Sequence, residues 1–269
     1  SDLNESVLLL NSVYECTRPR LVFSDIPLFE GILKDVFPES SVDKPINDKL
    51  IEKIKTVIST NLHLTPLPEA VTKAVEFYET QEMRHGIMLV GNAMSMKSTA
   101  WKSIELALNL NEEKRQIFTR ILNPKSITLD ELYGSFNPAT SEWSDGILSS
   151  SIRECSFSEE DCLKWIIVDG PVDSTWIESM NSLLDDNKVL CLPNNERIQI
   201  TPKVKMVFEV GDLSQASPAT VSRCGMIYFD QSLLPWTALA DSWYEKTAKI
   251  NEIAAKSLRE LMNKYVPSM

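Results

Sequence analysis

The amino-acid sequence predicts an α/β fold in which a five-stranded parallel sheet is flanked by helices. Short apolar runs alternate along the chain with segments of helical spacing, which is the pattern of a parallel sheet with crossover helices. The 269 residues, 43% hydrophobic and 24% charged, have the composition of a globular chain. The length suits one large domain, or one domain with a small appendage.

Five apolar runs bounded by polar or turn residues are the expected strands: 87–90, 117–122, 165–168, 204–210 and 226–229. Residues 98–110 and about 175–184 carry apolar side chains at helical spacing and predict helices that pack on the sheet. Two β-compatible runs, 188–192 and 197–200, surround an Asn-rich turn, which predicts a hairpin just before the fourth strand.

The two ends of the chain predict helices only. Residues 4–16, 47–60 and 69–81 have helical patterns, and the first 86 residues contain no strong strand pattern. Near the other end, apolar residues of 250–265 recur every three or four positions, so we expect one apolar helix face that needs a partner to cover it.

Composition argues against several classes of partner. Lys and Arg number 27 against 38 Asp and Glu, a net charge of −11, so a surface that neutralises nucleic acid is not expected. No apolar run approaches the roughly 20 residues of a membrane span. Five scattered cysteines predict unpaired thiols in a reducing compartment, and a first residue that is not Met indicates a piece of a longer protein.

The segment after the first expected strand has the frame of a phosphate-binding loop, G-x-x-x-x-G-K-[ST], with one mismatch. Lys97 and Ser98 stand where the motif places the lysine that bridges the terminal phosphates and the hydroxyl that binds Mg²⁺. Met96 replaces the second glycine, and we expect its Cβ to strain or reshape the loop. The alternative is an ordinary turn and a helix capped by Ser95. The candidate nucleotide-binding residues are Gly91, Asn92, Ala93, Met94, Ser95, Met96, Lys97, Ser98, Thr99 and Asp169.

Asp169 directly follows the apolar run 165–168. In nucleotide-binding sites, the carboxylate that holds the metal of the bound nucleotide lies at the same place, at the end of an apolar strand. The alternative is that Asp169 only caps the turn before the next helix. The following position, where a hydrolase carries a glutamate that polarises water, is Gly170, so we expect very slow turnover or none. Glu209 and Asp212 lie where nucleotide sensors usually offer an amide or a hydroxyl, which is a second departure from a hydrolase.

Arg223 precedes the fifth expected strand at the edge of the domain. An arginine at such an edge can reach the γ-phosphate of a neighbouring domain and stabilise its charge, an effect of about 10³ to 10⁵ in rate in other systems. The alternative is a salt bridge to acidic residues of its own domain.

Several strings together resemble the second AAA+ module of dynein heavy chains, over about residues 1–230. They are D-G-P-V-D at 169–173, W-I-E at 176–178, N-S at 181–182, L-D-D-N-K at 184–188 and A-S-P-A-T-V-S-R-C-G-M at 216–226, with shorter similarities at 28–32, 122–125 and 132–134. The D-G-P-V-D string is closer to axonemal than to cytoplasmic members.

The resemblance implies an AAA+ P-loop NTPase core at 87–230, a helical lead-in of the same large subdomain at 1–86, a pre-sensor β-hairpin at 188–200, and the start of a truncated helical lid at 231–269. It implies a module that holds ATP or ADP with Mg²⁺, through Ser98 and Asp169, without hydrolysing it. Arg223 would act in trans on the first module of the ring.

The resemblance also implies the partners. They are the neighbouring AAA+ modules and the linker of the same heavy chain, the microtubule on which the full minus-end motor walks, and the dynein intermediate and light chains. The linker contacts would be made by the hairpin and by an insertion at 133–143. The implied location is the cytoplasm and cytoskeleton, in a ciliary or flagellar axoneme. Two alternatives stay open: an active P-loop ATPase in which Asp173 or Asp212 replaces the missing base, and a nucleotide-free ring scaffold in which Met96 has closed the loop.

Overall fold

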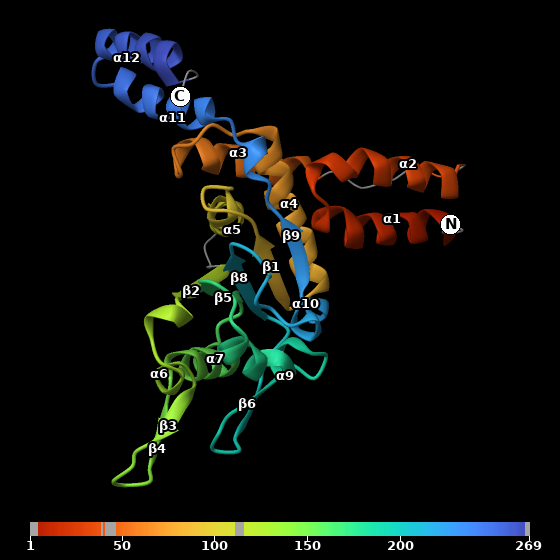
Figure 1. Ribbon diagram of the computed structural model, residues 1–269, viewed down its shortest axis with the longest axis vertical. Coiled ribbons are helices and arrows are strands. Elements are labelled where there is room, and N and C mark those ends of the chain that lie inside the picture. Colours follow the sequence, from red (N-terminus) through yellow and green to blue (C-terminus); the bar gives the residue numbers. More distant parts are fainter. Residues whose placement is uncertain (1–4, 39, 41–46, 111–115, 267–269) are drawn as a thin grey trace.

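The computed structural model describes residues 5–38, 40, 47–110 and 116–266. Its centre is a five-stranded parallel sheet of order β2-β5-β8-β1-β9, which confirms the predicted class and all five predicted strands (Figure 1). The strands are β1 (Gly86–Val90), β2 (Ile117–Leu122), β5 (Leu163–Asp169), β8 (Val204–Val210) and β9 (Gly225–Tyr228).

Both faces of the sheet are covered, which explains why its strands are almost continuously apolar. One face packs against α3 (Asp48–Thr60), α4 (Pro68–Met83) and α5 (Lys97–Asn109) through Ile87, Trp165 and Val207. The opposite face packs through Met88, Val168 and Phe208 against α7 (Ile147–Phe157), α8 (Ser174–Ile177) and α9 (Asn181–Leu184). Alternate residues of each strand therefore belong to two separate cores.

The predicted helix at 175–184 is not continuous. A 3₁₀ turn, Glu178–Met180, separates α8 from α9, although Trp176, Met180 and Leu184 are buried on one side as the spacing indicated. The predicted hairpin is confirmed as β6 (Val189–Cys191) and β7 (Arg197–Gln199). A second hairpin, β3 (Gly134–Phe136) with β4 (Trp143–Asp145), follows α6 (Leu129–Tyr133). Arg153 of α7 bonds Asp145 beside one hairpin and Glu196 of the other.

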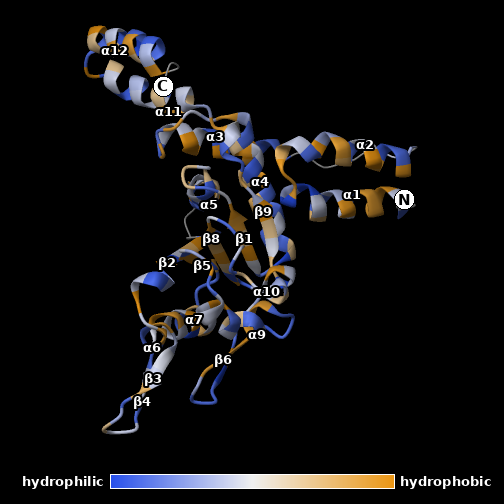
Figure 2. Ribbon diagram, in the orientation of Figure 1, coloured by the Kyte–Doolittle hydropathy of each residue, from blue (hydrophilic) through white to orange (hydrophobic). Residues whose placement is uncertain are grey.

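Helical pairs project at two corners (Figure 1). Near the N-terminus lie α1 (Glu5–Thr17) and α2 (Ile26–Val36), joined by the short 3₁₀ turns Arg18–Arg20 and Phe23–Asp25, and near the C-terminus lie α11 (Trp236–Ala248) and α12 (Glu252–Tyr265). The predicted helices at 4–16 and 250–265 correspond to α1 and α12, and residue 4 lies outside the described residues. Figure 2 shows apolar residues on these projecting helices as well as in the sheet.

The predicted apolar stripe near the C-terminus is exposed, with Ile253, Leu261 and Tyr265 of α12 among its members. No helix of the described part combines the length and apolar character that crossing a membrane requires. The structure describes all five cysteines and joins none of them to another. The remaining elements are α10 (Pro218–Arg223) and the 3₁₀ turns Pro124–Ser126 and Gln231–Leu233.

Candidate functional site: a phosphate-binding cleft

The candidate loop connects the carboxyl end of β1 to α5, as the motif requires. Its first residue must be glycine, because a Cβ on Gly91 would lie 2.3 Å from the carbonyl oxygen of Phe229 and 2.8 Å from Ser95 Oγ. Gly91 therefore lets the loop pass close to the end of β9.

Met94 and Met96 both adopt left-handed backbone conformations, with φ of 62° and 72°. In this conformation a residue other than glycine costs roughly 1–2 kcal/mol, so the φ of Met96 agrees with the expectation that a Cβ is penalised there. The alternative, a helix capped by Ser95, is not observed. Met96 is the N-cap residue of α5 and makes no side-chain cap, while Ser95 Oγ donates to the carbonyl oxygen of Asn92 at 2.8 Å.

The ammonium group of Lys97 lies inside this loop. Its Nζ donates to the carbonyl oxygens of Gly91 at 2.6 Å and Asn92 at 2.7 Å. Burial lowers the pKa of Lys97, and the nearby carboxylates of Glu209 and Asp169 act in the opposite direction. The lysine is thus at the cradle that the motif predicts for phosphate, and it bonds the loop's own backbone there.

Asp169 and Ser98 are brought together with the loop in one cleft. It has a volume of about 470 Å³ and is lined by residues 93–99, 169–171 and 209–211. Adjacent strands place Asp169 of β5 directly beside Glu209 of β8. The alternative in which Asp169 caps the next helix is not observed, because the capping side chain is that of Asp173, which accepts from the backbone N–H of Thr175 at 3.0 Å.

Glu209 is the member of the site whose contacts the sequence did not indicate. It is only 7% exposed, its Oε2 accepts from Ser98 Oγ at 2.6 Å, and its Oε1 accepts from Trp101 Nε1. From the sequence, Glu209 was expected only at a nucleotide-sensor position that departs from a hydrolase, and Trp101 lay within the predicted helix at 98–110. The hydroxyl that the motif offers to Mg²⁺ therefore donates its proton to a buried carboxylate.

The side chains that line the cleft fit a magnesium ion that phosphate oxygens also coordinate better than a metal ion coordinated by protein side chains alone. Among the described residues, no group of three or more His, Cys, Asp or Glu side chains is placed to hold a metal. Ser98 and Asp169 offer the oxygen ligands that Mg²⁺ takes together with phosphate oxygens and water. A bound nucleotide would supply the ligands that are missing.

Neither of the two alternative bases reaches the cleft. Asp173 accepts hydrogen bonds from Thr175 and from Lys125 Nζ at 3.0 Å, and these bonds, the backbone N–H of Thr175 first, lower its pKa to about 2. Asp212 accepts from the hydroxyl and the backbone N–H of Ser214, which lowers its pKa as well. Such carboxylates are weak bases, and neither lines the cleft.

A second, apolar pocket of about 200 Å³ adjoins the cleft. Met94, Met96 and Thr99 line both spaces. The remaining lining residues come from the stretch between the end of α3 and the first turn of α4, and from residues 234–242, which include the first half of α11. They are Ile58, Leu64, Thr65, Ala70, Leu234, Ala238, Leu239 and Ser242. A ligand with phosphates at one end and a flat, mainly apolar group at the other fits this pair of spaces. No motif in the sequence signalled the pocket, because its walls come from three distant segments.

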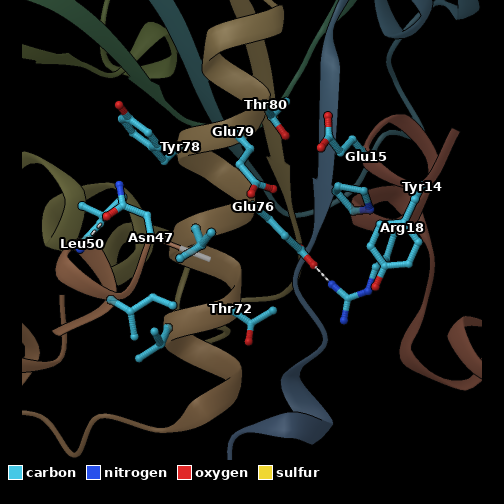
Figure 3. A pocket seen from close by; sticks show the side chains of 14 residues that line it. Tyr14, Glu15, Arg18, Asn47, Leu50, Thr72, Glu76, Tyr78, Glu79 and Thr80 are labelled. Carbon is cyan, nitrogen blue, oxygen red and sulfur yellow. Dashed lines mark hydrogen bonds and ion pairs between the residues drawn. The ribbon is translucent and has the colours of Figure 1, made fainter. Parts of the chain in front are cut away.

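Another hollow lies between α1, α3 and α4 (Figure 3). Its volume is about 580 Å³, and Glu76 on its wall bonds Arg18 across the hollow and also Lys73 Nζ at 2.8 Å. The residues of the phosphate-loop motif are not among those that line it.

Arg223 ends α10, just before β9, and therefore lies at the amino end of the sheet, opposite the loop. Its Nη1 donates to the carbonyl oxygen of Ala219 at 2.6 Å, and its Nε lies 3.5 Å from Asp185 Oδ1 without forming a hydrogen bond. The side chain is 31% exposed. The structure does not bring Arg223 to the chain's own cleft. The alternative interpretation, a salt bridge to an acid of its own domain, is represented only by the 3.5 Å contact with Asp185.

Two family models match the chain. One, described as the hydrolytic ATP binding site of the dynein motor region, matches residues 1–98, and the other, described as an AAA domain of the dynein-related subfamily, matches residues 86–224. The first match ends at Ser98, so Asp169 and Gly170 fall within the second.

Curated relatives cover nearly the whole chain. Dynein axonemal heavy chain 3 of Mus musculus is 44% identical over 248 residues, 90% of this chain and 6% of its own length. Dynein axonemal heavy chain 12 of Rattus norvegicus is 40% identical over 274 residues, 99% of this chain and 9% of its own. Dynein axonemal heavy chain 6 of Homo sapiens is 41% identical over 274 residues, with shares of 98% and 6%. The chain thus spans less than a tenth of the length of these relatives.

Proposed function

We propose, from the premise that the chain belongs to the dynein heavy-chain family, that it forms the second AAA+ module of the motor ring and holds ATP or ADP with Mg²⁺ without hydrolysing it. An AAA domain implies nucleotide binding in general. The retention of nucleotide is our inference from the cleft.

The observation that carries the proposal is the cleft in which Lys97, Ser98 and Asp169 meet. Position 170, the next along the chain, is glycine, and Glu209, the other carboxylate that lines the cleft, accepts hydrogen bonds from Ser98 and Trp101. Water needs a positioned base to attack a phosphate at neutral pH, and the two substitutes considered, Asp173 and Asp212, are engaged elsewhere. When bound, Mg²⁺ would neutralise phosphate charge. Lys97 would orient the terminal phosphates, and Ser98 and Asp169 would hold the ion. The adjoining apolar pocket would exclude water from the nucleobase.

The wider role of the chain follows from its relatives. We propose that Arg223 reaches the ATP of the first module in trans, and that the β3–β4 and β6–β7 hairpins contact the linker of the same heavy chain. Their coupling through Arg153 supports a joint role for the hairpins. The proposed setting is a minus-end microtubule motor with intermediate and light chains in a ciliary or flagellar axoneme.

The test combines binding with turnover. Titration calorimetry with ADP and ATP, with and without Mg²⁺, measures binding, and single-turnover hydrolysis measures chemistry. We expect binding without turnover, and Lys97→Ala should weaken binding by about 10-fold to 100-fold through loss of charge-assisted hydrogen bonds. Lys203→Ala is the matched control, because Lys203 pairs with Asp161 away from the cleft.

The same measurements discriminate between the alternatives. Turnover that disappears in Lys97→Ala would establish an active ATPase. Absence of binding at millimolar nucleotide with Mg²⁺ would favour the nucleotide-free scaffold. The specific observation in favour of the scaffold is the strained Met96, next to a lysine that already bonds the loop.

A further inference from the structure

Glu209 is a buried carboxylate that lines the proposed phosphate site. It lines the cleft at the end of β8, is 7% exposed, and accepts one hydrogen bond at each oxygen, from Ser98 Oγ and Trp101 Nε1. Both donors come from α5, whose first turn forms part of the cradle. Glu209 therefore joins the metal-binding hydroxyl to the core of the domain.

The bond to Glu209 determines which part of the Ser98 hydroxyl remains available. A serine hydroxyl has one proton to donate and two lone pairs that accept. Because the proton is donated to Glu209, the lone pairs remain for a group in the cleft. A cation uses such lone pairs, and a partner that holds a ligand from behind in this way fixes its orientation.

The charges in the cleft also favour binding of a cation. Glu209 and Asp169 lie side by side on adjacent strands, and the nearest cation, Lys97, already donates to two carbonyl oxygens. Two carboxylates and one ammonium leave a net negative charge before any phosphate arrives. In a partly buried site, phosphate oxygens added without a counter-ion are repelled more strongly than they would be in water.

The geometry points to Glu209 as a positioning residue that makes nucleotide binding at this cleft dependent on a divalent cation, by directing the Ser98 lone pairs to the ion and by repelling phosphate that arrives without one. This inference rests on the proposed nucleotide site and adds a requirement to it. Glu209 acts through Ser98 and through its charge, and it does not contact the reacting atoms.

The experiment measures the dissociation constant of mant-ADP for the full chain in Mg²⁺ and in EDTA. The ratio of the two constants should be at least about 100 in the unchanged protein. Glu209→Gln keeps the shape, removes the charge and can reverse the hydrogen bond to Ser98, so binding in EDTA should tighten and binding in Mg²⁺ should weaken. The ratio should fall by about tenfold, the scale of effects seen when a residue behind a metal ligand is changed.

Two further variants separate the carboxylate from packing and from overall charge. Asp212→Asn removes a negative charge just beyond the end of β8, from a residue that accepts bonds from Ser214, and should leave the ratio unchanged. Trp101→Phe removes the other donor to Glu209 and keeps the carboxylate, so its ratio should stay near that of the unchanged protein. Thermal unfolding without ligand checks that every variant is folded.

The outcomes are distinguishable from failure of the proposed function. No binding in Mg²⁺ by the unchanged protein overturns the nucleotide site and this inference with it. Binding that differs less than threefold between Mg²⁺ and EDTA overturns the inference alone. Equal loss of affinity in both conditions for Glu209→Gln, or the same fall in the ratio for Trp101→Phe, would show that Glu209 matters only for packing.

Discussion

The two ends of the central sheet carry charged side chains that behave differently. At the carboxyl end, Lys97 bonds the loop backbone, and Glu209 accepts from Ser98 inside a cleft of the same chain. At the amino end, Arg223 makes one hydrogen bond and one long contact, and its side chain is 31% exposed. The difference is consistent with the proposal that the carboxyl end holds a ligand within the chain and that the amino end offers Arg223 to a neighbouring site.

The strongest test of this contrast is Arg223→Ala in the assembled motor. If the guanidinium stabilises charge in a neighbouring site, the ATPase rate of that site should fall by about 10³-fold. Nucleotide affinity of this chain's own cleft should not change, because Arg223 lies at the opposite end of the sheet. Steady-state ATPase together with mant-ADP binding measures both quantities.

Arg223→Lys is the matched control for that experiment. Lysine keeps the positive charge but lacks the planar pair of donors, so it should restore only part of the rate. An unchanged ATPase rate in Arg223→Ala would end the proposal that the amino end acts in trans.

A second experiment tests the carboxyl end of the sheet by adding a catalytic base to the cleft. Gly170→Glu places a carboxylate next to Asp169, and turnover should rise by about 10²-fold over the unchanged protein, the lower range for a positioned base. The new Cβ would lie 3.1 Å from Asn123 Oδ1 and 3.2 Å from Pro124 Cδ, so these neighbours need to shift by only a few tenths of an ångström.

Gly170→Gln is the control for the added base, because it has nearly the same size and no basic oxygen. Single-turnover hydrolysis should distinguish the two variants. Equal rates in both would mean that a missing carboxylate is not what limits turnover in the cleft.

A smaller effect is expected from Met96→Gly, which addresses strain at the carboxyl end alone. Removing a Cβ from a residue with φ of 72° should stabilise the folded protein by about 0.5–1 kcal/mol, because the relief of left-handed strain is partly offset by the greater freedom of an unfolded glycine. Urea unfolding measures the change in the free energy of unfolding.

Met88→Gly is the control, because Met88 lies in the core and its truncation should destabilise the protein. A loss of stability in Met96→Gly would show that the packing of the methionine side chain contributes more than its backbone strain costs.

The smallest expected effect concerns His85, at the amino end of β1. Its Nε2 lies 3.0 Å from the carbonyl oxygen of Leu183, and burial, assisted by Lys188 and Lys205, lowers its pKa. Because the folded-state pKa lies below that of the unfolded chain, the unfolded state binds more protons between the two values. Stability should therefore decline as the pH falls below about 6.5, the pKa of an unperturbed histidine.

His85→Gln keeps a donor for Leu183 and cannot titrate. Comparing unfolding free energies at pH 7.5 and 5.5 in both proteins isolates the histidine contribution. The same pH dependence in both would assign the decline to other groups.

Much of the sheet was predictable from the sequence, because β1, β5 and β8 are buried on both faces and so read as uninterrupted apolar runs. Helix α7 was not predicted. Ser149, Ser150 and Ser151 favour turns over helix interiors, and they obscure the spacing of Leu148, Ile152 and Cys155, all of which are buried. Where polar residues fill a helix next to a core, tertiary packing outweighs local preference.

The candidate site also contains residues that were predictable from the sequence and contacts that were not. Lys97 and Ser98 belong to a contiguous motif, and Asp169 ends a recognisable strand, so local pattern sufficed for them. The bonds from Glu209 to Ser98 and Trp101 depend on the register of β8 and on side-chain conformations, and no local pattern encodes these. The adjoining apolar pocket combines three distant segments, and its composition does not stand out in any one of them.

The contacts of Lys97 have a consequence for the kinetics of ligand arrival. Its ammonium group has three N–H donors and uses two of them on backbone oxygens, so a phosphate that takes more than one of these donors has to exchange with the bonds to the loop. Association should then be limited by this internal step once ligand is abundant, and the same two bonds are ready to re-form on departure. If this exchange is slow, a nucleotide that has been captured in the cleft would also dissociate slowly.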